Sequence, residues 1–170
     1  MKRVALAVAL GMAIACSPYV ATTTSAPSPV VTVNPAPSPA VMPVLLPPGA
    51  QWGPGPASLP AGARAVVIDG DPTKEGLFTM RLLLPDDYRV PPHSHAANEH
   101  ITVISGVFHV GMGNTFTMAG AEELRQGSFK AIAPGMTHFA HAAGETVIQL
   151  HGMGPWRLTY VNPADDPRNR

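Results

Sequence analysis

The most informative stretch of this 170-residue chain is His93-Ser94-His95-Ala96-Ala97-Asn98-Glu99. It predicts both the fold and the chemistry of the protein. On a strand, side chains at positions i and i+2 project from the same face, so His93 and His95 can reach one common point. The short run 96–98 then lets Glu99 return to that face at the start of the next strand. Imidazole with carboxylate suits a borderline divalent transition metal, and such sites usually keep open positions for water or substrate.

The residues around this stretch favour the metal-site interpretation. A His-x-His pair alone is more often polar surface sequence than a pair of metal ligands. Here, however, Pro91 and Pro92 stiffen the approach to His93 and favour extended backbone. Residues 100–105 are rich in β-branched side chains and end at Gly106, which indicates a strand that leads into a turn.

The spacing of these residues resembles the first motif of the cupin superfamily, Gly-x5-His-x-His-x3-Glu-x6-Gly. His93, His95, Glu99 and Gly106 stand at the motif's positions, and Asp87 stands where its leading glycine belongs. Aspartate tolerates a positive φ better than most residues, so we expect Asp87 to hold that turn.

A second cupin motif, Gly-x5-Pro-x-Gly-x2-His-x3-Asn, is matched in part further along the chain. Gly127, Gly135 and His138 stand at its positions, whereas Ala133 replaces the proline and Ala142 replaces the asparagine. The asparagine is not a metal ligand in the family, so its loss leaves the metal assignment intact. The resemblance spans residues 62–162.

The resemblance to this superfamily implies a metal site and a set of reactions. The family's ligands fall on four residues of this chain: His93, His95, Glu99 and His138. The cofactor implied is a divalent transition metal: Mn, Fe, Ni, Cu or Zn. The function implied is a metal-dependent oxidoreductase, dioxygenase-like, acting on a small organic substrate, although cupins also include decarboxylases and isomerases. A non-catalytic cupin that binds a metal or a small ligand is the alternative, because fold does not fix chemistry.

Composition and strand pattern agree with an all-β fold, a single cupin β-barrel of the double-stranded β-helix or jelly-roll type. The chain has 20 prolines, 16 glycines and only 13% charged residues, which favours short strands with many turns over a helical bundle. A helical turn is expected at 121–125. Strands are expected at 64–69, 77–84, 88–95, 100–105, 107–112, 129–133, 137–141, 146–151 and 157–161.

The chain divides into three parts by composition. Residues 1–16 read as a signal peptide of the lipoprotein type, with a basic start and an apolar run too short to span a membrane. Residues 17–60 form a linker rich in Pro, Ser and Thr that contains no charged residue and favours extended or disordered backbone. Residues 61–170 form the cupin domain.

Cys16 is the only cysteine of the chain and follows Ala13-Ile14-Ala15, which resembles a degenerate bacterial lipobox. We expect Cys16 to be lipidated and the protein to be exported, either as a membrane-anchored lipoprotein or, with plain cleavage near Ala15, as a periplasmic protein of a bacterium. A small molecule is the expected partner, and the resemblance adds a homodimer. Nucleic acid is a poor candidate, because 11 basic and 11 acidic residues form no basic patch in the sequence.

Two polar residues late in the chain are candidates to support the metal. Gln149 and His151 share one face of a strand, while Ile148 and Leu150 share the other. The sequence does not decide which face lies inside, so a role beside the metal and an ordinary core position both stay open for Gln149 and His151. The remaining histidines are expected to lie away from the metal: His100, His109 and His141.

Overall fold

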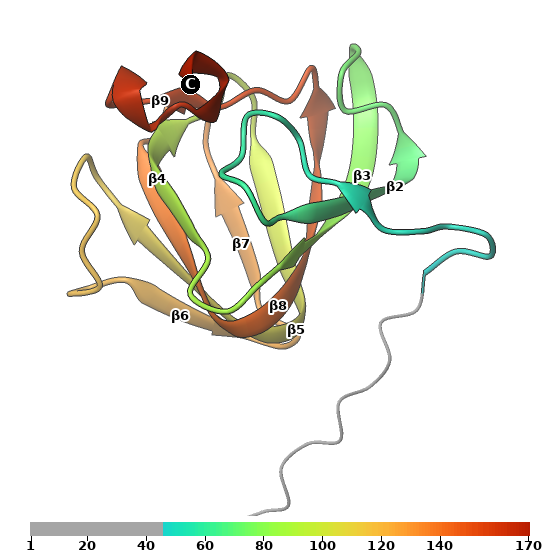
Figure 1. Cartoon of the computed structure of the whole chain (residues 1–170), viewed down its shortest axis with the longest axis horizontal. Helices are drawn as coiled ribbons and strands as arrows, with labels where there is room; N and C mark the ends of the chain where they lie inside the picture. The colour runs from blue at the N-terminus through green and yellow to red at the C-terminus, as the bar shows by residue number, and fades with distance from the viewer. Residues whose placement is uncertain (1–45) are drawn as a thin grey trace, which may run out of the picture. The chain divides into compact units, whose positions relative to one another are not determined.

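A computed structural model describes residues 46–170 of the chain (Figure 1). The signal segment predicted at 1–16, Cys16 and the first part of the predicted linker lie outside the described residues. Within residues 46–170, no helix is long and apolar enough to cross a membrane.

The described part of the chain is all-β, as predicted from the sequence. Its strands belong to a nine-stranded sheet, and two short 3-10 helices follow near the C-terminus. The strands are β1 (Gly53–Pro54), β2 (Arg64–Gly70), β3 (Gly76–Leu84), β4 (Arg89–Ser94), β5 (Glu99–Met112), β6 (Glu122–Arg125), β7 (Phe129–Ile132), β8 (His138–Gly154) and β9 (Thr159–Tyr160). The helices are η1 (Pro163–Asp165) and η2 (Pro167–Asn169).

Strands β5 and β8 are long because each belongs to both halves of a jelly roll. One part of β8 pairs with β3 and the other with β4, while β5 pairs with β7 through residues 99–102 and with β6 through residues 107–110. The two strands also pair with each other, from Glu99↔Gly152 to Met112↔His138. One half therefore holds β1, β2, β3 and β7, and the other holds β4, β6 and β9 (Figure 1).

The shared β5–β8 ladder turns a corner at Gly106. The pairing register shifts there, so that Gly106 stands opposite the three residues 144–146. Gly106 has a φ of 82°, and a β-carbon at this position would lie 2.6 Å from the carbonyl oxygen of Glu145. Only glycine combines a positive φ with so close a backbone approach. The last residue of the first motif is therefore the corner at which the ladder bends.

The core lies between the two halves and follows the alternation of the strands. On β3, the inward positions Phe78, Met80, Leu82 and Leu84 are buried, and the residues between them are half-buried. Burying one such side chain contributes about 1.5–3 kcal/mol. This two-residue period is the pattern that predicts a half-buried strand.

The turn before β4 confirms the expectation for Asp87. Its φ is 56°, and it is the one residue other than glycine with positive φ among residues 46–170. Its carboxylate accepts hydrogen bonds from the Arg89 guanidinium, and its Oδ1 lies 2.9 Å from Nε2 of His141. Aspartate therefore replaces the motif's glycine here without losing the turn.

Several elements differ from the sequence prediction. The strands predicted on either side of Gly106 are one strand, β5, and the two predicted on either side of Gly144 are one strand, β8. Residues 121–125 contain good helix formers and were expected to form a helical turn, but 122–125 form β6 and pair with β5. Tertiary pairing overrides weak local propensity at this position.

Residues 53–60, the last part of the predicted linker, pack against the strands that follow. Strand β1 pairs with β2, and Leu59 belongs to the hydrophobic core. Two tyrosines fix this segment from the domain: the Tyr88 hydroxyl donates to the Pro60 carbonyl and the Tyr160 hydroxyl donates to the Ser58 carbonyl. Residues 53–60 are therefore part of the fold.

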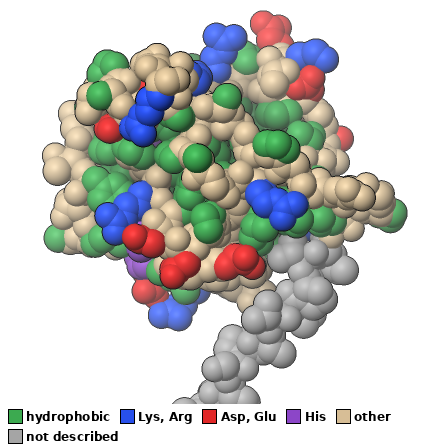
Figure 2. Space-filling model, in the orientation of Figure 1, with side chains coloured by type: hydrophobic (Ala, Val, Ile, Leu, Met, Phe, Trp, Pro, Cys, Tyr) green, Lys and Arg blue, Asp and Glu red, His purple; other side chains and the backbone are tan. Residues whose placement is uncertain are grey.

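Charged side chains are scattered over the surface. Figure 2 shows one face on which Lys and Arg lie among Asp and Glu, with hydrophobic side chains dispersed between them. Ion pairs join Lys74 to Asp71 and Arg125 to Glu123, and exposed pairs of this kind contribute only about 0–1 kcal/mol each. That nucleic acid is not a partner stays a prediction.

We predict that Gly106→Ala lowers the free energy of unfolding more than Gly127→Ala does. Both glycines have a φ above 80°, which costs alanine about 1–2 kcal/mol. At Gly127 a β-carbon meets no atom within 4 Å, whereas at Gly106 it meets Glu145 and Thr146, and overpacking adds about 1–3 kcal/mol. Urea unfolding of the two variants measures the difference. Equal losses would show that the close approach of Glu145 and Thr146 adds no cost at Gly106.

Candidate metal centre

Four predicted residues come together between the two halves of the jelly roll. Glu99 is the first residue of β5, in one half, and His138 is the first residue of β8, in the other. His93 lies near the end of β4 and pairs with His138, and His95 follows that strand directly. All four side chains are buried, and His138 is only 1% exposed.

The three histidines form a group that can hold a metal ion. One nitrogen of each ring lies within 4.8 Å of the corresponding nitrogens of the other two. The Glu99 carboxylate adjoins this group, with Oε1 3.4 Å from His95 Nε2 and Oε2 3.4 Å from His138 Nε2. The sequence motif therefore corresponds to one cluster in space.

Backbone carbonyls determine which nitrogen each histidine presents. Nδ1 of His93 lies 2.7 Å from the Pro91 oxygen, Nδ1 of His95 lies 2.9 Å from the Arg157 oxygen, and Nδ1 of His138 lies 3.0 Å from the Met136 oxygen. A carbonyl only accepts, so each Nδ1 carries the proton. A neutral ring then has a lone pair on Nε2, the form in which histidine binds metals.

One of these Nε2 atoms has no hydrogen-bond partner within residues 46–170. It belongs to His95, and it is fully buried. A buried polar atom without a partner costs about 1–3 kcal/mol, a cost that an ion bound to Nε2 would remove. Three imidazole nitrogens and one carboxylate are the donors that a divalent transition metal accepts, so the residues fit such an ion.

Burial and the neighbouring rings lower the pKa values of His93 and His95. Burial, followed by the neighbouring rings of His138 and His95, lowers the pKa of His93 to about 3. Burial also lowers the pKa of His95, against the attraction of Glu99. For Glu99, burial acts to raise the pKa, but the adjoining His138 and the other two imidazoles outweigh it and lower the pKa. Neutral imidazoles with an ionised carboxylate are ready to bind a cation.

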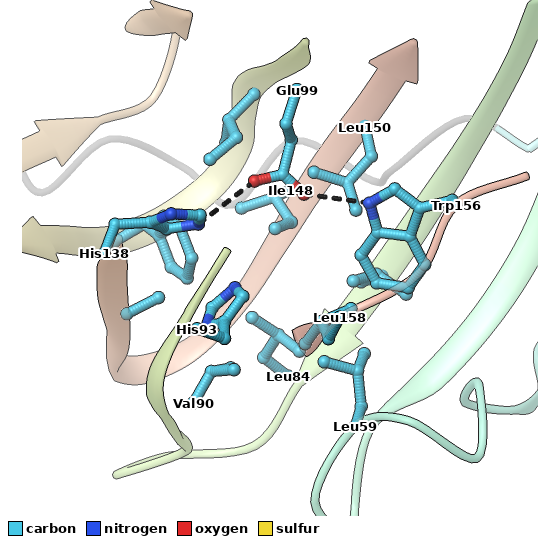
Figure 3. Close-up of a pocket in the computed structure, with 14 residues that line it drawn as sticks. Leu59, Leu84, Val90, His93, Glu99, His138, Ile148, Leu150, Trp156 and Leu158 are labelled. Carbon is cyan, nitrogen blue, oxygen red and sulfur yellow. Dashed lines mark hydrogen bonds and ion pairs between the residues drawn. The ribbon is translucent and has the colours of Figure 1, made fainter. Parts of the chain in front are cut away.

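A small pocket of about 30 Å³ lies beside the cluster. His93, Glu99 and His138 form its polar side, and Figure 3 shows Glu99 between His138 and Trp156. The remaining lining is apolar: Leu59, Leu82, Leu84, Val90, Ile101, Phe108, Ala140, Ile148, Leu150 and Leu158. No lysine or arginine appears among the described residues that line it.

Sequence reasoning missed Trp156. Its indole N–H donates to Glu99 Oε1 at 3.1 Å, and its ring stacks on His95 with centroids 5.4 Å apart. It lies 57 residues from Glu99, in the irregular segment between β8 and β9. The only signal was the rarity of tryptophan, of which the chain has two.

Gln149 and His151 lie on the outer face of β8, so neither supports the metal. Gln149 Oε1 accepts a hydrogen bond from Arg81 at 3.1 Å, and His151 Nδ1 lies 3.0 Å from the Thr79 hydroxyl. Ile148 occupies the inner face instead and lines the pocket. The same alternation takes the other histidines to partners outside the cluster: His100, His109 and His141.

Comparison with known proteins places this fold in a family. Residues 51–167 match the model of a domain of unknown function, DUF4437. The chain belongs to the DUF4437 family. No curated protein matches this DUF4437 chain.

Solved structures show that this DUF4437 domain has the cupin fold. A putative acetylacetone dioxygenase from Methylibium petroleiphilum is 19% identical, with a TM-score of 0.53, and the match covers 69% of this chain and 79% of that one. The polyketide cyclase RemF from Streptomyces resistomycificus is 17% identical, with a TM-score of 0.51 and coverage of 62% and 75%. A cupin 2 domain-containing protein from Halorhodospira halophila is 19% identical, with a TM-score of 0.51 and coverage of 62% and 74%.

We predict that the metal-free protein loses stability as the pH falls below about 6.5. The pKa of His93 is about 3 in the folded chain and 6.5 ordinarily, so between these values the unfolded chain binds a proton that the folded chain does not. The free energy of unfolding therefore falls as the pH falls through this window. The lowered pKa of His95 acts in the same direction. Urea midpoints in the presence of a chelator, measured at about pH 7 and about pH 5, test this.

The control is the double variant His93→Gln, His95→Gln, which removes both titrating rings. Its midpoint should change less between the two pH values than that of the wild type. The explanation fails if the two proteins show the same pH dependence.

Proposed function

We propose that this protein is a metal-dependent oxidoreductase, dioxygenase-like, that acts on a small organic substrate. The proposed metal ligands are His93, His95, Glu99 and His138. The observation that carries the proposal is the unpartnered Nε2 of His95 in a buried cluster beside an apolar pocket. Mn, Fe, Ni, Cu and Zn all suit this donor set.

The chain's own residues prepare this site in three ways. The carbonyls of Pro91, Met136 and Arg157 hold the protons on Nδ1, so the rings do not need to change tautomer. The charge of Glu99 partly offsets that of a divalent ion. A bound ion supplies Lewis acidity and, if it is redox-active, a path for electrons.

The pocket favours a neutral, mainly apolar substrate that carries oxygen donors. Apart from the cluster and the Trp156 indole, its described lining is aliphatic or aromatic. Such a wall excludes water and offers no lysine or arginine to a free carboxylate, which could pair only with the proposed ion and would lose more on leaving water than a neutral substrate. Diketones and phenols of a few carbon atoms meet these requirements.

The lining also favours oxygen chemistry over hydrolysis or isomerisation. General acid–base catalysis requires a titratable group within hydrogen-bond reach of the substrate. Among the described lining residues, the titratable groups are His93, Glu99 and His138, and the proposal uses all three as ligands. A bound ion would itself acidify a neutral oxygen donor of the substrate, so oxygen chemistry would need no separate base in the lining.

We predict that protein reconstituted with Fe²⁺ or Mn²⁺ consumes oxygen with small diketones or phenols and not with the matching carboxylates. Replacing Glu99 with Gln removes the anionic ligand, so both metal content and oxygen uptake should fall at least 10-fold. A loss of about 10-fold is the lower end of what removal of a ligand's hydrogen-bond partner causes, and loss of a ligand itself should cost no less. Elemental analysis and an oxygen electrode provide the measurements.

His109→Gln is the matched control, because His109 lies outside the cluster beside Glu123. This variant should keep one metal ion per chain and its oxygen uptake. Metal binding without oxygen uptake across the panel would instead support a non-catalytic binding protein. Full metal content in Glu99→Gln would contradict the ligand assignment.

We also propose that the protein is exported and anchored to a bacterial membrane through a lipid on Cys16. The support is the order of a basic start, an apolar run and Ala13-Ile14-Ala15-Cys16 in the sequence. The wild-type protein should then fractionate with membranes, and Cys16→Ser should release it. A soluble periplasmic wild type would favour plain cleavage near Ala15. The homodimer expected from the resemblance stays a prediction.

A further inference from the structure

Trp156 joins two of the proposed metal ligands. Its indole N–H donates to Glu99 Oε1 at 3.1 Å, while its ring lies stacked on His95 at an interplanar angle of 20°. The ring also lines the pocket and is only half-buried (Figure 3). One side chain therefore contacts the carboxylate, an imidazole and the substrate space.

We propose that Trp156 is a positioning residue of the metal centre, which directs Glu99 to bind the ion through Oε2. The inference rests on the metal site proposed above. Because the indole N–H engages Oε1, the carboxylate has one oxygen less available for the ion. Binding through a single oxygen leaves more coordination positions for substrate and dioxygen. The stacked ring meanwhile restricts rotation of His95.

The turn between β2 and β3 holds Trp156 in place. Its backbone N–H donates to the Pro72 carbonyl at 2.7 Å. Nearby, Gly154 approaches the same turn so closely that a β-carbon would lie 2.1 Å from the Lys74 carbonyl oxygen. An ion pair between Lys74 and Asp71 joins the two ends of this turn. The indole thus rests on an ordered support outside the metal cluster, as a positioning role requires.

The chain supplies a matched pair of variants, because Trp52 is its second tryptophan. Trp52 takes part in the fold through its carbonyl, which accepts a hydrogen bond from Arg64, and Trp52→Phe keeps that carbonyl. Trp156→Phe keeps an aromatic ring that can lie over His95, and it removes the N–H donor together with part of the indole surface. Any difference between these two variants reports on the indole of Trp156.

The experiment titrates metal-free wild type and both variants with Co²⁺. Trp52→Phe should bind one equivalent with wild-type affinity, and its remaining tryptophan fluorescence should be quenched up to that equivalence point. Trp156→Phe should bind about 10–100-fold more weakly, the loss typical when an outer partner of a ligand is removed. Its visible Co²⁺ spectrum should also change, because Oε1 becomes free to bind.

A second measurement avoids dependence on the folding of Trp156→Phe. In the Trp52→Phe protein, the single indole N–H resonance should shift on addition of Zn²⁺ and stop shifting at one equivalent. Equal Co²⁺ affinity and equal spectra for the two variants would overturn the role of Trp156 and leave the metal site standing. Failure of the wild type to bind Co²⁺ and Zn²⁺ would instead overturn the metal site, and this inference with it.

Discussion

The bend of the β5–β8 ladder is the constraint on which the site depends. Glu99 and His138 lie at opposite ends of this ladder, yet their side chains come within 3.4 Å of each other. In a flat sheet, strands of this length would separate them by several residues of rise. The corner at Gly106 lets one half of the jelly roll face the other, so the ends of the ladder meet in the interior.

The arrangement of the cluster separates the task of orienting ligands from the task of binding. Each Nδ1 is engaged by a carbonyl of the backbone, a group that cannot change its protonation state. The orientation of His93, His95 and His138 therefore depends on the course of the main chain and not on other ionisable side chains. Glu99 is the exception, since a side chain, Trp156, holds it. Its position is the one that a single substitution elsewhere can change most easily.

Much of this molecule could be predicted because its motifs are local. The positive φ of Asp87 and the shared face of His93 and His95 follow from spacing within short segments, whereas His138 joins them through the resemblance to a family. What could not be predicted depends on tertiary pairing. Along β8, either of the two alternating sets of side chains could face the interior. Only the position of β8 in the folded chain shows that Ile148 lies inside. Trp156 contacts Glu99 across 57 residues of sequence, and no local period connects the two.

Leu59 lines the pocket although it lies far before the proposed ligands in the sequence. Enclosing a substrate therefore requires a longer part of the chain than holding the ion does. All four proposed ligands fall within residues 93–138. The apolar wall, however, includes Leu59, held by the contacts of Tyr88 and Tyr160 with the carbonyls on either side of it, and Leu158 from the other end of the domain. A homologue that kept both motifs but lacked the residues before β2 would retain the donor set with one side of its pocket open to water. Comparing the segment before β2 among relatives would therefore separate proteins that enclose a substrate from those that only hold an ion.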